Sequence, residues 1–454
     1  MNKTVNEWYA ANKDSVDNLA RTIWENPELG HTEFYACRVN ADYLLEWGFD
    51  VTVFNARGDD APPTAIKAKF GSGHPIVGIY GEYDALPGLG QDSVSRRSEK
   101  EGHGHGCGHN LMAACASSAA AAAKAAMEKE GLSGTIIYLG CPAEEGGAGK
   151  MYMLEDGYFD ELDCLISWHP RSNDLSVQEK LQMTLARFVV EFRGVSAHAA
   201  VNPESGRSAL DACELMNVGV NYLREHCTDD VRIHYSYLSA GEKPNIVPAY
   251  AALDYYCRSK SLETCRDLLR RIELVAKGAA MMTETECSFI VDNMHSGCQP
   301  LVGFNEFLYN SALKIPPLEY TDEEKTFAAE LCKNVTGKEI SPENALAHKL
   351  AKPTGNFFFA SGSTDVGCVT YKIPTARLYG LGVAKEVPMH SWGVVATAGN
   401  SIGFKAARYA GQALAQCAYD IFKSPESVKE FKKELDERME GKDTRQIFPQ
   451  RNKK

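Results

Sequence analysis

The chain has 454 residues, of which 44% are hydrophobic and 24% are charged, and its formal net charge is −12. This is the composition of an ordinary globular protein that is long enough for two or three domains. The excess of acidic residues argues against nucleic acid and against anionic membranes as partners, because both repel a negatively charged protein. We therefore expect a small-molecule ligand.

Cysteine usage and hydropathy indicate the compartment. The fourteen cysteines are scattered through apolar segments and do not form the framework of a small disulfide-rich protein. Residues 1–14 contain no apolar core of a signal peptide, and no apolar run reaches the roughly eighteen residues of a membrane-spanning helix. These features predict a soluble, cytoplasmic protein that does not associate with membranes.

Helices alternate with short apolar strands in the first part of the chain. Helical spacing of apolar residues predicts helices over 5–24 and 33–47, and an alanine-rich run predicts another over 111–124. Apolar runs bounded by turn residues predict strands over 50–54, 64–70, 76–80, 134–140 and 164–168. Such alternation indicates an α/β fold, with a mixed, mainly parallel sheet flanked by helices.

The pattern changes after residue 183. Strands are predicted over 185–193, 231–238, 250–258 and 286–292, and helices over 207–225 and 263–282. The order β-α-β-β-α-β is the ferredoxin-like split motif. We therefore predict an inserted α+β domain over 184–297, between the two parts of the first domain, 1–183 and 298–454.

The rest of the chain returns to the first domain. Helices are predicted over 305–313, 322–335 and 397–422, with a strand over 375–381. The charged tail, 424–454, predicts a surface helix that frays at its end.

A glycine-spaced array of potential metal ligands lies at 102–110. Its sequence, Gly-His-Gly-His-Gly-Cys-Gly-His-Asn, places His103, His105, Cys107 and His109 at every second position. Imidazole and thiolate suit a borderline-soft divalent ion, and glycine lets the backbone approach one closely. The alternative is a flexible loop with exposed histidines, and the roles of His103 and His105 stay open between ligand and supporting contact.

Further polar residues follow the predicted strands. Asp84, Glu144, Glu145 and His169 each come just after an apolar strand, and His390 lies in the loop after 375–381. Ligands of parallel sheets bind outside the carboxyl ends of the strands, so these side chains are expected to converge. Alternatively, Glu144 and Glu145 lie in a solvent-exposed turn and take no part in a binding site.

Together these residues suit a site for two metal ions. Cys107, His109, Glu145, His169 and His390 are more ligands than one tetrahedral ion needs, but they suit two ions that share a bridging ligand. A water between the ions would become hydroxide near neutral pH, and Glu144 is placed to act as its general base. The donor set accepts Zn²⁺, Mn²⁺ or Co²⁺, of which we expect Zn²⁺ or Mn²⁺, so the identity of the metal stays open.

Five segments, in the same order along nearly the whole chain, resemble the metal-dependent amidohydrolases and metallopeptidases that include aminoacylases, carboxypeptidase G and auxin-conjugate hydrolases. The segments are 104–110, 142–147, 168–170, 194–200 and 388–392. Ser-Thr-Asp-Val-Gly at 363–367 and His-Ser-Trp at 390–392 most resemble the aminobenzoyl-glutamate hydrolase branch. The resemblance implies a zinc-exopeptidase-like catalytic domain with a lid and dimerisation domain.

The resemblance also implies roles for the metal-site residues. Cys107 would bridge the two metals. His109 and His169 would complete the coordination of one ion, and Glu145 and His390 would complete that of the other. Glu144 would be the general base.

Three residues of the inserted domain receive roles from the resemblance. His198 would act across a dimer interface to polarise the scissile carbonyl. Asn245 and Arg258 would lie near the substrate carboxylate. The planar guanidinium group of arginine can donate hydrogen bonds to both oxygens of a carboxylate.

The chain departs from related branches at two places. Asn110 stands where the auxin-conjugate branch has aspartate, and Glu82-Tyr83-Asp84 stands where the peptidase branch has a histidine-x-aspartate pair. We therefore interpret Asp84 as a carboxylate that orients His109.

Three functions are compatible with these residues. The first is hydrolysis of the amide of an N-acyl or aminobenzoyl amino acid, such as p-aminobenzoyl-glutamate. The second is a dipeptidase or N-acyl-amino-acid hydrolase with another side-chain preference, and the third is a non-catalytic partner in a hetero-oligomer. We expect a homodimer through the lid domain, or a heteromer with a related subunit.

Overall fold

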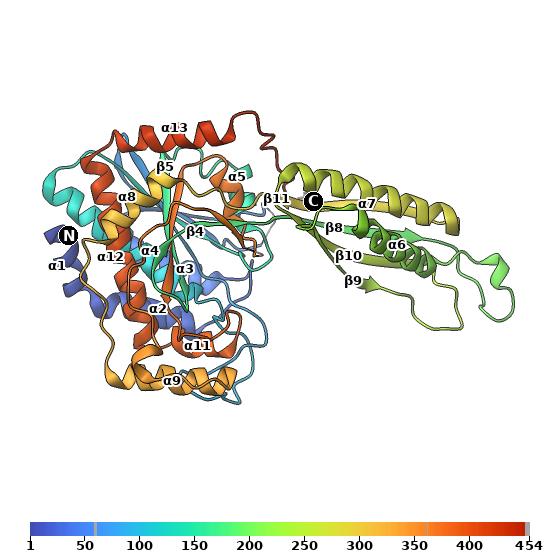
Figure 1. Ribbon diagram of the computed structural model, residues 1–454, viewed down its shortest axis with the longest axis horizontal. Helices are drawn as coiled ribbons and strands as arrows, with labels where there is room; N and C mark the ends of the chain where they lie inside the picture. The colour runs from blue at the N-terminus through green and yellow to red at the C-terminus, as the bar shows by residue number, and fades with distance from the viewer. Residues whose placement is uncertain (59–60, 361, 450–454) are drawn as a thin grey trace.

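The computed structural model describes residues 1–58, 61–360 and 362–449. A large helix-covered domain contains the N-terminal and C-terminal helices, and a narrow second domain projects from one side (Figure 1). Following the expectation from the resemblance, we use the names catalytic domain and lid domain for them; the strands and helices of the lid domain lie within residues 184–295. This agrees with the predicted α/β fold with an inserted α+β domain.

A seven-stranded sheet forms the centre of the catalytic domain, in the order β1-β2-β4-β3-β5-β13-β6. Its four inner strands are parallel, and β1, β2 and β6 are added by antiparallel pairing. The strands are β1 (Asp50–Phe54), β2 (Ala65–Ser72), β3 (Ile76–Glu82), β4 (Gly134–Cys141), β5 (Cys164–Arg171), β6 (Ser176–Val177) and β13 (Thr375–Gly382). The predicted mainly parallel sheet is confirmed.

Helices cover both faces of this sheet because the inner strands are apolar on both sides. Alternate residues of β4 contribute to two different hydrophobic clusters, Ile136 and Tyr138 to one and Ile137 and Leu139 to the other. The larger cluster lies under α1 (Lys3–Ala11), α2 (Lys13–Glu25), α3 (Phe34–Glu46), α4 (His109–Glu130), α8 (Val302–Ala312), α12 (Ser401–Lys423) and α13 (Ser427–Met439). The smaller one lies under α5 (Gly149–Glu155) and α10 (Val366–Thr370).

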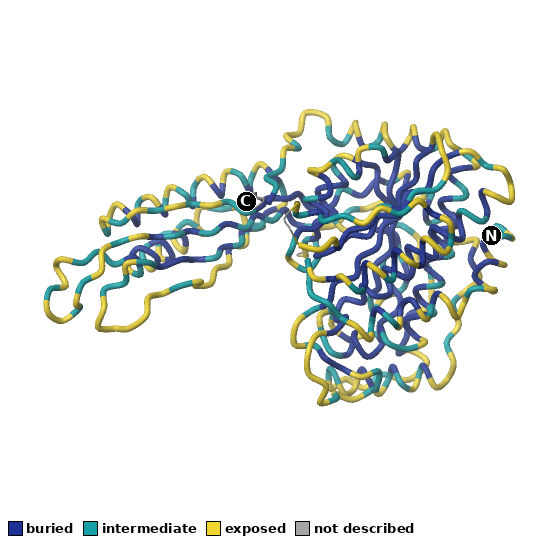
Figure 2. The backbone as a smooth tube through the Cα atoms, turned by 180° about the vertical axis from the view of Figure 1, so that it is seen from behind, coloured by how far each residue is buried: buried dark blue, intermediate teal, exposed yellow. Residues whose placement is uncertain are grey.

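The lid domain is a four-stranded antiparallel sheet in the order β11-β8-β10-β9 with two helices on one face. Its elements are β8 (Thr184–Arg193), α6 (Ala209–Leu223), β9 (Arg232–Ser239), β10 (Tyr250–Ser259), α7 (Leu262–Thr283) and β11 (Glu286–His295). Alternate residues of β8, among them Phe188 and Phe192, are buried against the helices, and the residues between them are more exposed. In Figure 2 the loops at the far end of the lid domain are exposed, whereas buried segments lie along its strands and helices. The ferredoxin-like order is confirmed.

Two predicted long helices are each interrupted. The helix predicted over 5–24 is α1 and α2, separated at Asn12, whose backbone and side-chain nitrogens both donate to the carbonyl oxygen of Trp8. The helix predicted over 397–422 is α12 except at its start, because residues 397 and 398 belong to the separate helix α11 (Trp392–Ala398). Gly399, between the two helices, packs directly on the ring of Trp24. In both places a tertiary or capping contact overrides helical periodicity.

Short elements with little local signal were not predicted. Among the described residues, the strands β7 (Lys180–Gln182) and β12 (Phe358–Ala360) pair only with each other. The longer helix α9 (Asp322–Thr336), by contrast, confirms the helix predicted over 322–335. In the described part of the chain, no helix combines the length and the apolar character that crossing a bilayer requires.

The charged tail forms the predicted surface helix as α13, and the residues that follow this helix contact the lid domain. The chain crosses from the catalytic domain to the lid domain, where Ile447 and Met294 exchange two backbone hydrogen bonds of 3.0 and 2.8 Å. The side chain of Gln446 accepts from the backbone nitrogen of Ser296 at 3.0 Å. The predicted fraying beyond residue 449 lies outside the described residues.

Candidate active site

The five predicted ligands meet at the carboxyl ends of the parallel strands. Potential ligand atoms of Cys107, His109 and His169 lie within 4.8 Å of one another, and so do those of Cys107, Glu145 and His390. The two groups share Cys107. Segments that are far apart in sequence therefore place a thiol between two sets of nitrogen and oxygen donors.

Glycine makes this approach possible in the array. Gly108 precedes α4 in the left-handed region, with φ +76°, and a Cβ atom there would lie 2.7 Å from Cγ of Pro170. The backbone oxygen of Gly106 accepts a hydrogen bond from the backbone nitrogen of His390 at 2.8 Å. The array is therefore held between the strand that carries His169 and the loop that carries His390.

The other two histidines of the array lie elsewhere. His103 is exposed, whereas His105 is buried with Nε2 3.2 Å from the carbonyl oxygen of Ile23 in α2. Neither belongs to a ligand group among the described residues. His105 thus makes a supporting contact between the array and α2.

Asp84 connects two of the predicted ligands. One carboxylate oxygen lies 2.8 Å from Nδ1 of His109, and the other accepts from the backbone nitrogen of Glu145 at 2.9 Å. The buried Nε2 of His109 has no hydrogen-bond partner among the described residues. Such an arrangement fixes the ring and directs its second nitrogen toward the site.

His169 lies on β5 itself, at its carboxyl end, and not after the strand as the sequence suggested. Its Nδ1 lies 2.8 Å from the carbonyl oxygen of Pro170, and its Nε2 lies 3.4 Å from Sγ of Cys107. Burial and the nearby cation of Arg171 lower the pKa of His169 well below its usual value. The ring is therefore neutral, which is the form that binds a metal.

The chemistry of the donor set fits divalent metal ions. Nε2 of His390 lies 3.1 Å from a carboxylate oxygen of Glu145, and hydrogen bonding to Cys107 and Glu145 raises the pKa of His390 to about 10. In the metal-free chain a proton thus supplies the positive charge between these donors. The mixture of sulfur, nitrogen and oxygen donors, which includes Nε2 of His109, suits two ions that would replace such protons.

Glu144 is next to a predicted ligand but lines the adjoining pocket. Burial and the neighbouring carboxylates of Glu82 and Glu145 raise the pKa of Glu144 to about 8 in the metal-free chain. A nearby cation would favour its ionised form. The side chain is therefore able to exchange a proton near neutral pH.

A buried network next to the site was not predicted. Oε2 of Glu82 lies 3.4 Å from Nε2 of His109, and Oε1 of Glu82 lies 2.6 Å from Nζ of Lys150, which also contacts Asp365 at 2.7 Å. Glu82, His109 and Glu144 form a third group of potential ligands. The position of Glu82 at the end of β3 was a usable signal, whereas nothing in the sequence distinguished Lys150 from a surface lysine.

The loop of Glu144 is held by the N-terminal segment, which the sequence also did not reveal. The buried carboxyl group of Glu33 accepts from the backbone nitrogen of Ala143 at 2.6 Å, and Ala143 has a left-handed backbone with φ +54°. Nε2 of His31 lies 3.0 Å from the carbonyl oxygen of Gly147. These contacts fix both ends of the loop.

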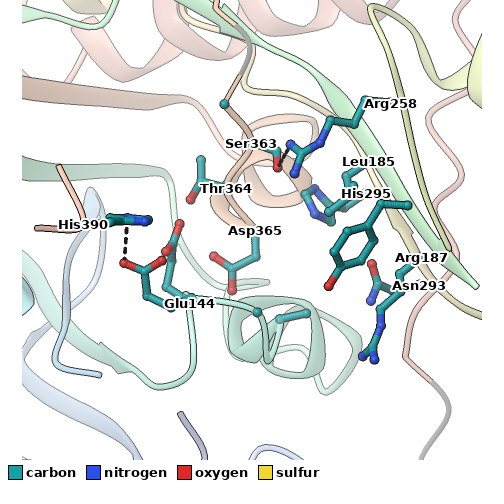
Figure 3. Close-up of a pocket in the computed structure, with 15 residues that line it drawn as sticks. Glu144, Leu185, Arg187, Arg258, Asn293, His295, Ser363, Thr364, Asp365 and His390 are labelled. Carbon is teal, nitrogen blue, oxygen red and sulfur yellow. Dashed lines mark hydrogen bonds and ion pairs between the residues drawn. The ribbon is translucent and has the colours of Figure 1, made fainter. Parts of the chain in front are cut away.

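A pocket of about 420 Å³ opens beside these residues (Figure 3). Glu144 and His390 lie on one side, and Arg258 lies on the side formed by the lid strands. Nη1 of Arg258 donates to the hydroxyl oxygen of Ser363 at 2.7 Å, and no carboxylate lies within ion-pair distance of it in the described part of the chain. The pocket therefore offers a half-buried cation opposite Glu144.

The structure does not bring His198 and Asn245 to this pocket. Both are exposed and lie in loops at the end of the lid sheet far from the catalytic domain, where the backbone nitrogen of Ala199 donates to the carbonyl oxygen of Asn245 at 3.0 Å. Nδ1 of His198 accepts from the backbone nitrogen of Ala200. Within one chain, these two residues are neighbours of each other and not of the predicted metal ligands.

Comparisons with known proteins agree with this geometry. Residues 78–391 match peptidase family M20/M25/M40. The chain is 33% identical to a p-aminobenzoyl-glutamate hydrolase subunit of Escherichia coli, covering 91% of this chain and 90% of that protein, and 29% identical to a Xaa-Arg dipeptidase of Mus musculus, covering 92% and 89%.

A solved structure shares the fold. It is that of a dinuclear metal-binding M20 peptidase of Bacillus subtilis, with a TM-score of 0.62 and 18% identity, covering 91% of this chain and 99% of that one. The resemblance to metal-dependent amidohydrolases is therefore confirmed. The chain is a metal-dependent amidohydrolase or peptidase that belongs to peptidase family M20/M25/M40.

Proposed function

We propose that this enzyme hydrolyses the amide bond between an acyl or aminobenzoyl group and an amino acid, with p-aminobenzoyl-glutamate as one candidate substrate. The observation that carries the proposal is the convergence of two potential ligand groups on Cys107. The similarity to the p-aminobenzoyl-glutamate hydrolase of Escherichia coli supports the aminobenzoyl class of substrate.

Two divalent ions, Zn²⁺ or Mn²⁺, would be held by Cys107 together with His109 and His169 on one side and Glu145 and His390 on the other. When bound, they would supply the Lewis acidity that makes water a nucleophile near neutral pH. Glu144 takes the proton from the attacking water and delivers it to the leaving amine. Arg258 binds the carboxylate of the amino acid, for which its planar fork is suited.

A homodimer through the lid domain would complete the site. β9 is an edge strand of the lid sheet, and exposed apolar side chains lie on both lid helices, with Tyr222 75% and Met281 82% exposed. In such a dimer, His198 of the partner subunit would polarise the scissile carbonyl and Asn245 of the partner subunit would bind substrate. The position of both residues far from the pocket of their own chain supports this arrangement.

Two alternatives follow from the relatives. The Escherichia coli protein is named as one subunit of its enzyme, which points to a heteromer with a related subunit, in which this chain could be the non-catalytic partner. The similarity to a Xaa-Arg dipeptidase points to a dipeptidase with another side-chain preference.

The free thiols of all fourteen cysteines support a reducing, cytoplasmic location.

The test is a hydrolysis screen of the purified chain reconstituted with Zn²⁺ or Mn²⁺. We expect cleavage of aminobenzoyl or acyl amino acids, and we expect Glu144→Gln to lose at least about a thousandfold in kcat while two ions remain bound. Loss of an ion in this variant would make Glu144 a ligand. No cleavage by the chain alone, with activity restored by a related subunit, would support the heteromer and contradict the proposal.

Subunit mixing tests the shared site. His198→Ala and Glu144→Ala homodimers should each be nearly inactive, and a mixture should recover part of the activity because one site of each mixed dimer has both residues. No recovery after confirmed subunit exchange would contradict the role of His198 across the interface.

A further inference from the structure

Two cross-strand rows of the lid sheet form one side of the pocket. Arg258, Leu185 and His295 are register partners in the first row, and Tyr256, Arg187 and Asn293 are partners in the second. All six side chains line the pocket. Figure 3 shows Arg258 at one end of this side and Arg187 at the other.

The two guanidinium groups differ in their partners. Arg258 donates to a neutral hydroxyl, so its charge is available to a substrate carboxylate. Arg187 donates through Nε and Nη2 to the two carboxylate oxygens of Asp254, at 3.2 and 3.1 Å, and through Nη1 to Asp292 at 3.5 Å. The second cation is therefore already compensated by two carboxylates.

A bulge in β11 places one of these carboxylates, that of Asp292, next to Arg187. The register shifts between Val291 and Asn293, so that Asp292 is an extra residue and both Asp292 and Asn293 lie opposite Arg187. Nδ2 of Asn293 donates to Asp292 at 3.0 Å and thereby positions it. Bulges of this kind often redirect a side chain next to a binding site.

The two aspartates hold Arg187 unequally. Asp254 makes the shorter, two-point contact and its side chain is 20% exposed, whereas Asp292 makes the single 3.5 Å contact and is 36% exposed. Asp254 therefore fixes the plane of the guanidinium group. Asp292 is the partner that an incoming ligand can replace.

We propose, on the basis of the function proposed above, that Asp292 is a specificity-determining residue that competes with a substrate side-chain carboxylate for Nη1 of Arg187. With the α-carboxylate on Arg258, the side chain of an acidic amino acid reaches the row of Arg187. There the substrate carboxylate takes the place of Asp292 at Nη1 of Arg187. The negative charge of Asp292 opposes this exchange, because the two carboxylates repel each other. Neutral and basic side chains leave the contact between Arg187 and Asp292 in place.

The experiment compares two substrates that differ by one group, aminobenzoyl-glutamate and aminobenzoyl-glutamine. Asp292→Asn should raise the ratio of kcat/KM for the glutamate substrate over the glutamine substrate about tenfold, because it removes the competing charge. Asp267→Asn is the matched control, since it makes the same charge change on the exposed face of α7, where Asp267 pairs with Arg270. Its ratio should equal that of the wild type.

Arg187 supplies the second half of the test. Arg187→Gln should lower the ratio, and Asp292→Asn should have no further effect on the ratio in that background, because the two residues act on the same carboxylate. An unchanged or lower ratio in Asp292→Asn, with wild-type circular dichroism and metal content, would overturn the proposal.

Failure of the proposed function looks different, because the wild type would then cleave neither compound. In that event, calorimetric binding of both compounds to Glu144→Ala and to Glu144→Ala with Asp292→Asn measures the same ratio without turnover. Absence of binding, or a ratio that does not rise, would also overturn the inference.

Discussion

Burial keeps His295 neutral beside the pocket. Its pKa is lowered to about 4 because desolvation disfavours the cation, and Arg258 adds repulsion. An unfolded histidine titrates near 6.5, so between these two values the unfolded chain binds a proton that the folded chain does not. The stability of the folded chain therefore falls as the pH is lowered from about 6.5 toward 4.

Replacement of His295 tests this sign. On acidification from pH 7 to pH 4, the wild type should lose about 3 kcal/mol more unfolding free energy than His295→Gln. Urea unfolding of both metal-free proteins at several pH values measures the difference, and the other histidines cancel because both proteins contain them. Parallel curves for the two proteins would contradict the lowered pKa, because they would show that His295 binds a proton equally well in the folded and the unfolded chain.

Single residues also show how far sequence reasoning reached. Cys107 and His109 were recognisable because only glycine separates the potential ligands, and Glu145 because it follows an apolar strand. Lys150 and Glu33 were not, since a lone lysine or glutamate gives no sign of burial until tertiary structure provides its partner. The contact of Lys150 with Asp365 spans 215 positions.

Elements were predictable where the local pattern agrees with the tertiary structure. β1 was predicted over the residues it occupies, and the order of the lid elements followed from periodicity alone. The pair β7 and β12 was missed because three-residue strands carry too little pattern and are stabilised by each other from distant parts of the chain. The bulge at Asp292 was likewise invisible, since it appears only against the register of β8.

The start of α4 is the element whose geometry bears most directly on the site. Gly108→Ala adds a Cβ atom to a residue with a left-handed backbone, in close contact with Pro170. The variant should therefore be less stable by about 1–3 kcal/mol and should bind metal at least tenfold more weakly. Gly131→Ala is the control at the other end of the helix, where φ is +62° and no atom lies within 4 Å of the added Cβ.

Thermal unfolding and metal titration separate the two effects. Gly131→Ala should lower the stability only by the amount that the left-handed backbone conformation costs, and its metal affinity should equal that of the wild type. Equal metal affinity in both variants would contradict the close approach of Gly108 to Pro170 as a determinant of the site.

At the scale of the whole molecule, the tail connects the two domains. Ile447 pairs with Met294 at the base of the lid and contributes to the lid core, whereas Phe448 packs with the smaller cluster of the catalytic domain. Asp443 adds an ion pair to Arg266 of α7 at 2.8 Å. The same short segment thus contacts both domains where the lid begins.

Truncation tests the contribution of the tail. Removal of residues 442–454 should speed hydrogen exchange at the backbone nitrogen of Met294, because its acceptor, the carbonyl oxygen of Ile447, is lost. Removal of 450–454 alone is the control and should leave that exchange unchanged. Slow exchange at Met294 in the longer truncation would show that the lid base is held without the tail.

The account as a whole depends on Cys107 being shared by two ions. The most direct test is a crystal structure of the metal-reconstituted enzyme with anomalous scattering recorded at the edge of the added metal. We expect two peaks, each at about 2.3 Å from Sγ of Cys107 if the metal is zinc, with His169 on one ion and His390 on the other. A single ion, or two ions of which neither contacts the sulfur, would contradict the two-metal site.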